Sequence, residues 1–87
     1  MDFVWVFSGP RNHFPSSVFA TREQAEAWIA MHRLEGTLTK YPVGISAYDF
    51  AIQQGHFTPR KPEHSSPAFI ANFSSATQDH YHYEREG

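Results

Sequence analysis

The sequence predicts a small α+β domain, in which one mainly antiparallel sheet of about four strands carries two to three helices packed on one face. Three observations support this class. An aromatic and β-branched run occupies residues 3–7, helical periodicity is strongest over residues 21–33, and histidine alternates with tyrosine near the C-terminus. The expected order of elements is β-β-α-β-α-α-β, in a single domain over residues 1–87.

The first predicted strand runs from Phe3 to Phe7. Aromatic rings occupy every odd position and valines the even ones, so both faces are apolar. This pattern predicts a strand that is buried on both faces and therefore central in its sheet. Turn-forming residues at 8–12 and Pro15 separate it from a short second strand at Ser17–Ala20, and the two are expected to form a hairpin.

The clearest helix spans Thr21 to Arg33. Thr21 can cap it, and Gln24 follows at the spacing of a capping box. Gly36 is a natural stop for this helix. Residues at helical spacing form one stripe that is expected to face the core: Ala25, Trp28, Ile29 and His32.

A third strand is predicted at Thr37–Tyr41, because these residues are rich in β-formers and Pro42 cannot donate to a ladder. A second helix follows, with Ser46 as its N-cap and Gln54 near its end. Gly55 is expected to close it in the left-handed region of backbone space.

The C-terminal third predicts a surface loop, a short helix and a last strand. The loop covers His56–Ser65 and contains prolines. Ser66 and Pro67 form an N-cap followed by proline at the first helical position. The last strand is expected at Thr77–Arg85.

In an extended strand the side chains alternate between two faces. One face of the last strand would carry His80, His82 and Glu84, and the other Tyr81, Tyr83 and Arg85. The first face is either a polar site backed by an aromatic core or the solvated edge of a small sheet.

Two histidines spaced i and i+2 on a strand point the same way, which is a ligand geometry that zinc accepts. Glu84, His56 or His64 could supply a third ligand to the His80–His82 pair. The alternative interpretation is an exposed strand face that happens to carry polar residues.

The predicted loop carries imidazole, guanidinium and ammonium groups that could hold an anion or an acidic partner surface. Its candidate residues, which surround the Pro59–Pro62 segment, are His56, Arg60, Lys61 and His64. A solvated, proline-stiffened loop is the alternative. Tyr48 is expected at the border of the buried stripe of its helix, where a tyrosine often contacts a partner.

Composition excludes several classes. Seven Lys and Arg face nine Asp and Glu without a basic block, so a nucleic-acid footprint is missing. The chain has no cysteine, which excludes disulfides, thiolate metal sites and a cysteine nucleophile. The apolar start is too short to cross a membrane, so a soluble cytoplasmic protein is expected. No G-x-S-x-G elbow or phosphate-cradling glycine loop is present, which argues against an enzyme.

Several runs together resemble a family of small, mostly bacterial, stand-alone proteins classed as a domain of unknown function. The runs are VWVF at 4–7, AEAWI at 25–29, GTLTKYPV at 36–43, YDFAI at 48–52, KPEH at 61–64 and HYHYE at 80–84. The resemblance covers nearly the whole chain. It implies a bacterial soluble single domain and brings no activity, cofactor or catalytic residue with it.

These observations favour a non-catalytic protein-binding module, of which an immunity protein or antitoxin-like inhibitor of a toxin is one form. The alternative is a small-ligand or metal-binding protein that uses the histidine-rich last strand together with the Pro59–Pro62 loop, with zinc as an example of the metal. A homodimer through an open sheet edge is a further expectation.

Overall fold

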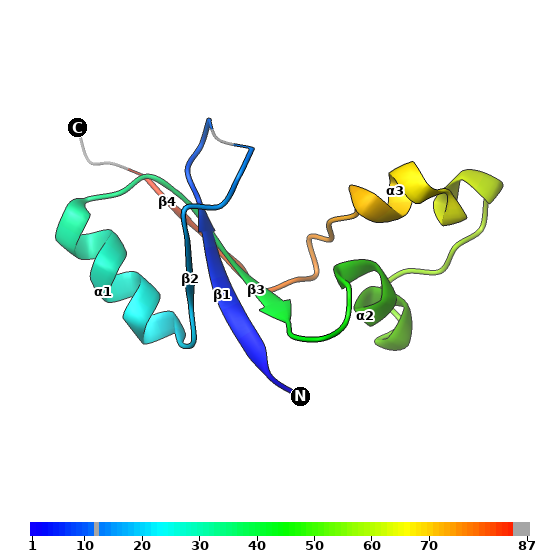
Figure 1. The fold of residues 1–87 in the computed structure, drawn as a ribbon, viewed down its shortest axis with the longest axis horizontal. Coiled ribbons are helices and arrows are strands. Elements are labelled where there is room, and N and C mark those ends of the chain that lie inside the picture. Colours follow the sequence, from blue (N-terminus) through cyan, green and yellow to red (C-terminus); the bar gives the residue numbers. More distant parts are fainter. Residues whose placement is uncertain (12, 85–87) are drawn as a thin grey trace.

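The computed structural model describes residues 1–11 and 13–84, and it confirms the predicted fold class and order of elements (Figure 1). One antiparallel sheet has the strand order β2-β1-β3-β4. The elements are β1 (Phe3–Ser8), β2 (Ser17–Phe19), α1 (Arg22–His32), β3 (Gly36–Pro42), α2 (Ala47–Gln53), the 3₁₀ helix η1 (Pro62–Ser65), α3 (Pro67–Ala71) and β4 (His80–Tyr83).

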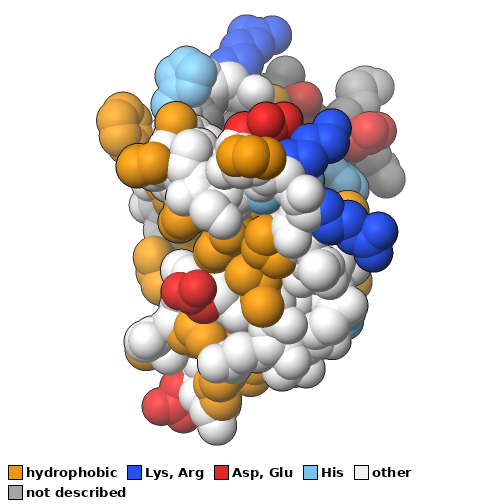
Figure 2. Space-filling model, turned by 90° about the vertical axis from the view of Figure 1, so that its right-hand side faces the viewer, with side chains coloured by type: hydrophobic (Ala, Val, Ile, Leu, Met, Phe, Trp, Pro, Cys, Tyr) orange, Lys and Arg blue, Asp and Glu red, His pale blue; other side chains and the backbone are white. Residues whose placement is uncertain are grey.

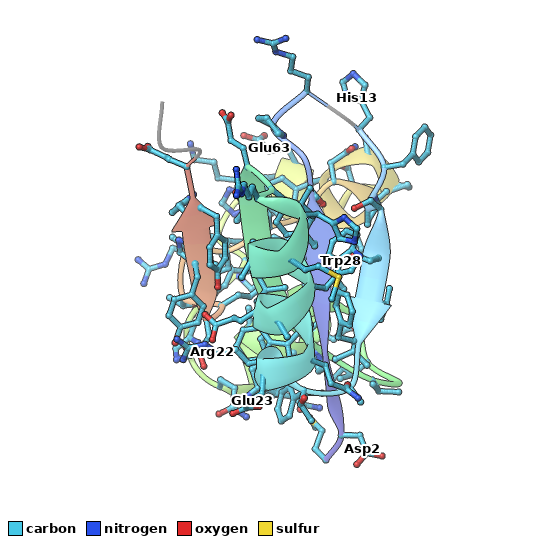
Figure 3. All side chains as sticks on the ribbon, turned by 90° about the vertical axis from the view of Figure 1, so that its left-hand side faces the viewer. Asp2, His13, Arg22, Glu23, Trp28 and Glu63 are labelled. Atoms are coloured by element: carbon cyan, nitrogen blue, oxygen red, sulfur yellow. The ribbon has the colours of Figure 1, made fainter. Side chains whose placement is uncertain are left out.

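The pairing register places β1 in the centre of the sheet, as its sequence predicts. Trp5 lies opposite Phe19 on one side and Lys40 on the other. Leu38 of β3 lies opposite both Phe7 and Tyr81. Directly opposed residues of antiparallel strands point to the same face, so these side chains all belong to the face that α1 covers (Figure 3).

The core between the sheet and α1 is small and aromatic. Its buried residues are Phe7, Ala25, Ile29 and Leu38. Trp28 packs edge-on against Phe7, with ring centroids 5.7 Å apart, and also contacts Phe19 at 5.5 Å. Full burial of an aliphatic or aromatic side chain stabilises a fold by roughly 1.5–3 kcal/mol, so a few residues supply much of the driving force here.

Helix α1 lies between Thr21 as its N-cap and Arg33 as its C-cap, which agrees with the predicted span. The Thr21 hydroxyl accepts from the Gln24 N–H at 3.1 Å, and the Gln24 side chain accepts from the Thr21 N–H at 3.2 Å. The C-cap is Arg33, in the left-handed region at φ 53°. The prediction that Gly36 stops the helix is wrong, because the N–H groups of Arg33 and Leu34 already close its last turn on Ala30 and Ile29.

Gly36 has a different task at the start of β3. Its φ is 155°, and a Cβ built there would lie 2.7 Å from Phe7 Cζ and closer still to the Ser8 carbonyl oxygen. Glycine therefore permits the close approach of β3 to β1 beside the core.

The second face of the sheet is more open than the sequence predicts. Val4 and Val6 are half-buried, and so are Phe3 and Trp5 of the face under α1, where Phe7 is the buried residue of β1. The prediction that β1 is buried on both faces is therefore wrong. None of the residues of the second face is buried; they are Val4, Val6, Ser8, Val18, Thr37, Thr39, Tyr41, His80 and His82. The C-terminal helices pack on one another around Tyr48, and α2 contacts the end of the sheet through Phe50, whose ring centroid lies 5.8 Å from that of Phe3 on the first face.

These helices form a second aromatic cluster around Tyr48, which is buried together with Ala51. The Tyr48 ring packs edge-on against Phe73, at 5.4 Å and 89°, and contacts Phe57 at 5.8 Å. Two adjacent clusters make the molecule long, with extents of 44 × 28 × 17 Å. The radius of gyration is 14.5 Å, against about 12 Å for a compact chain of this length.

The C-terminal third differs from expectation in two places. The predicted surface loop at 56–65 contains η1. The last strand starts at His80 and not at Thr77, because a turn closed by the Gln78 N–H on the Ser75 carbonyl, at 3.1 Å, occupies the preceding residues. Position 85, the expected end of this strand, lies outside the described residues.

The longest of the described helices, α1, has 11 residues, and none of them has the length and apolar run that a bilayer crossing requires.

We predict that Gly36→Ala lowers the free energy of unfolding by about 2 kcal/mol or more, because the new Cβ meets the backbone of β1. Gly55→Ala is the control. Gly55 has a φ of 74° with open space around it, so only the backbone cost of roughly 1–2 kcal/mol remains there. Urea unfolding measures both, and a smaller loss at Gly36 than at Gly55 would contradict this account.

Candidate functional site

Strand β4 alternates as predicted. Tyr81 and Tyr83 point to the face under α1, and His80 and His82 point to the second face. The register places His82 opposite Thr37 and His80 opposite Thr39. The four residues thus separate into an anchoring pair and an exposed pair.

The anchoring pair contacts the first two turns of α1 (Figure 3). Arg22 donates to the Tyr81 hydroxyl at 2.9 Å, and its guanidinium carbon lies 3.8 Å from the ring centroid. The Tyr83 hydroxyl donates to Glu26 at 2.7 Å. Arg22 and Glu26 form an ion pair at 3.4 Å along the helix. Together these contacts hold a four-residue edge strand against a helix that lies 50 or more residues earlier in the chain.

The environment of Tyr83 favours its neutral form. Burial is the largest cause, and together with the hydrogen bond to the Glu26 carboxylate it raises the pKa of the Tyr83 phenol from its ordinary 10.0 to about 12. An ionised phenolate would lose this bond and would face the carboxylate.

The exposed pair has an arrangement that suits metal ligation. The His80 and His82 ring centroids are 5.1 Å apart at 86°. His80 Nδ1 lies 2.8 Å from the Gln78 carbonyl. A carbonyl only accepts, so Nδ1 carries the proton and Nε2 keeps its lone pair. His82 Nδ1 lies 3.3 Å from the Thr37 hydroxyl, which can accept in the same way.

One chain does not complete a metal site around this pair. Among residues 1–11 and 13–84, no group of three or more His, Cys, Asp or Glu side chains could hold an ion. Glu84, the third ligand expected from the alternation, follows the end of the strand and does not join the two imidazoles. His56 and His64, the other expected third ligands, belong to the helical part of the molecule.

The predicted loop site has a structural function at His64. The Nδ1 atom of His64 accepts from the backbone N–H of Arg60 at 3.1 Å and lies 3.4 Å from that of Lys61. Its ring packs against Phe69 at 5.0 Å and Phe57 at 5.4 Å. The imidazole therefore organises the loop from within.

The expectation that Tyr48 lies at the border of the buried stripe of its helix is wrong. The residue lies inside the second aromatic cluster. Only 7% of it is exposed, and its hydroxyl donates to the His64 carbonyl at 2.8 Å. The partner lies 16 residues away in η1, which helix periodicity cannot reveal. Of the candidate contact residues, His56, Arg60 and Lys61 remain exposed.

The structure does not bring the loop and the last strand together. In Figure 1 the segment before α3 lies at one end of the long axis, and β4 lies beside α1 near the other. Among residues 1–11 and 13–84, no group of three metal-ligating side chains joins the Pro59–Pro62 loop to the histidine strand, and a joint site of the two stays a prediction.

A hollow of about 200 Å³ lies between the end of the sheet and α2. Lys40 is its central charge, 4.0 Å from Asp79 and 4.3 Å from the Phe3 ring centroid. Sequence reasoning missed Lys40, because only the strand register places it beside Phe3 and Asp79. Ligand pockets usually have volumes of about 300–1,000 Å³, so this hollow is small for an organic ligand.

A family model described as Domain of unknown function (DUF7710) matches residues 4–87. The chain belongs to this family. The match agrees with the resemblance that the sequence runs indicate, and it covers nearly all of the chain. No curated protein matches the chain, and no solved structure does. Because the DUF7710 description assigns no activity, the surfaces above are the basis for a functional proposal.

We predict that this DUF7710 domain loses stability as the pH rises from about 10 through 12, and that part of this loss disappears in Tyr83→Phe. The folded pKa of about 12 exceeds the ordinary 10.0, so the contribution of Tyr83 is complete below pH 10 and vanishes above pH 12. The substitution also costs about 1 kcal/mol at pH 7 through the lost hydrogen bond.

Urea unfolding at pH 7 and at several values between pH 9 and 12 measures both effects. Tyr41→Phe, which alters a half-buried tyrosine on the second face, is the control and should keep the alkaline loss of the wild type. An identical alkaline loss in Tyr83→Phe and wild type would contradict the assignment.

Proposed function

We propose that this protein is a non-catalytic binding module that covers a partner protein with the second face of its sheet. The observation that carries the proposal is that this face contains Val4, Val6 and Tyr41 and yet has no buried residue. Apolar and aromatic side chains on a flat, incompletely covered surface are typical of a protein interface.

The dimensions of the face support the proposal. The inner strands β1 and β3 are roughly 20 Å long and the edge strands β2 and β4 roughly 10–13 Å. At a spacing of about 4.8 Å, the four strands cover on the order of 300 Å² in projection. A standard interface buries about 800 Å² on each partner, so flanking residues would have to contribute. Phe14 and Val43 are 81% and 50% exposed and lie at opposite ends of the sheet, where they could extend the contact.

The remaining surface agrees with a contact of mixed character. Figure 2 shows the side of the molecule that carries α2 and α3, where hydrophobic side chains lie among polar ones and Lys and Arg gather along one border. The net charge of −2 is mild. An immunity or antitoxin-like form of the proposal has a basic toxin as the partner, since opposite charge accelerates encounter.

The experiment is affinity capture from the native host with a purified bait, compared between surface variants. Val18 is 61% exposed on the edge strand β2, and Val18→Lys and Thr39→Lys each place a charge on the proposed face. Ala27→Lys places the same charge on the exposed side of α1 and is the matched control.

We expect a partner that binds wild type and Ala27→Lys equally and binds each face variant at least tenfold more weakly, measured by calorimetry with the isolated partner. If the partner binds Val18→Lys and Thr39→Lys as tightly as it binds the wild type, the proposed surface is contradicted. For the immunity form, the gene beside this one should encode a toxin whose growth arrest the wild type relieves and Val18→Lys does not.

A further inference from the structure

We propose that two copies of this chain join through antiparallel pairing of their β4 edges, and that His80 and His82 of both copies then form a four-imidazole site for a divalent transition metal such as zinc. The inference is independent of the partner-binding function proposed above. It rests on the backbone direction of β4, on the ring nitrogens of the two histidines and on the incompleteness of the site in one chain.

The outer edge of β4 carries backbone groups that point away from the sheet. In an antiparallel pair, alternate residues direct their N–H and C=O groups toward the neighbouring strand. The Lys40 N–H donates to the Asp79 carbonyl at 2.9 Å, and Lys40 is the residue that opposes Asp79 in the register. Asp79, Tyr81 and Tyr83 therefore direct their backbone groups toward β3, and those of His80 and His82 point outward.

The outward groups meet no strand in the described part of the chain, since β4 is the last strand of the sheet. Such an edge is a template for another strand. A copy related by a two-fold axis through Tyr81 would place His80 opposite His82 of the other copy, so each of the two pairs exchanges two backbone hydrogen bonds.

The four imidazole rings of such a dimer lie within reach of one common point. Opposed residues in a hydrogen-bonded pair have Cα atoms about 5.5 Å apart, and residues i and i+2 of a strand are about 7 Å apart. All four imidazoles project from one face of the extended sheet, because His80 and His82 share a face in each copy. The Cα atoms of the four histidines form a rectangle with these two distances as its sides, and its centre lies roughly 4–5 Å from each Cα atom. An imidazole can reach this distance, and its nitrogen binds zinc at about 2.0–2.1 Å.

The contacts of the ring nitrogens favour coordination through one nitrogen of each ring. Histidines that bind metals usually donate their other ring N–H to a carbonyl or similar acceptor, which fixes the tautomer and the ring orientation. His80 already donates from Nδ1 to the Gln78 carbonyl, and His82 Nδ1 lies beside the Thr37 hydroxyl. Nε2 of the neutral imidazole is thus the coordinating atom of His80, and it is the coordinating atom of His82 when the Thr37 hydroxyl accepts from Nδ1.

One chain supplies two ligands, whereas zinc is almost always four-coordinate and tetrahedral in structural sites. The partner copy supplies the other two, and the metal in turn links the two short edges. Four-residue strands that pair without a metal would make a weak dimer, so association is expected to depend on the ion.

The experiment adds zinc chloride to the untagged full chain at pH 7.5. Light scattering after size exclusion measures the mass, and calorimetry measures the stoichiometry. We expect the mass to rise from 10.0 kDa to twice that value with one zinc ion for two chains. His80→Ala and His82→Ala should each abolish both effects. Because both histidines are exposed, the metal-free variants should unfold at the same temperature as the metal-free wild type.

Two controls separate this site from others. Glu84→Gln should bind zinc and dimerise as the wild type does, because the proposed site does not use Glu84. His13→Ala removes an exposed histidine outside β4 and should also behave as the wild type. Cobalt(II), used as a second probe, should show the strong visible absorption of tetrahedral coordination.

Binding of one ion per chain without a change in mass would overturn the proposal, as would a loss of binding in Glu84→Gln, which would indicate a site within one chain. Absence of any zinc effect up to millimolar concentration, or dimerisation that persists in His80→Ala and His82→Ala, would overturn it equally.

Discussion

The orientation of β4 is the constraint on which the functional surface depends. Tyr81 and Tyr83 are held by Arg22 and Glu26 of α1, and a strand with a two-residue period cannot turn one set of side chains inward without turning the other outward. The imidazoles of His80 and His82 are therefore exposed because the phenols are anchored. A one-residue slip of this strand would exchange the two sets.

A second consequence follows from the small size of the chain. With 87 residues, the fold does not cover both faces of its sheet, because α2, η1 and α3 use their aromatic residues to pack around Tyr48. The sheet keeps one well-covered face under α1 and one face of half-buried valine, threonine and tyrosine residues. The same division of the core into two clusters that lengthens the molecule also leaves it a surface for contact.

Local rules account for what the sequence predicted correctly. The capping box of Thr21 and Gln24, the cap at Ser46 and the alternation of β4 are decided by neighbours within a few residues. The misjudged positions depend on distant partners. Tyr48 is buried because its hydroxyl meets the His64 carbonyl, Gly36 is needed because β1 passes close by, and the open second face of β1 depends on where later helices pack. No periodicity in one segment contains that information.

Amide hydrogen exchange of residues 80–83, followed by NMR in the metal-free protein, tests the orientation of β4 most directly. The amides of Tyr81 and Tyr83, which point toward β3, should exchange at least tenfold more slowly than those of His80 and His82, which point to solvent. Protection of the two histidine amides with rapid exchange at the two tyrosines, or equally rapid exchange at all four, would contradict the account.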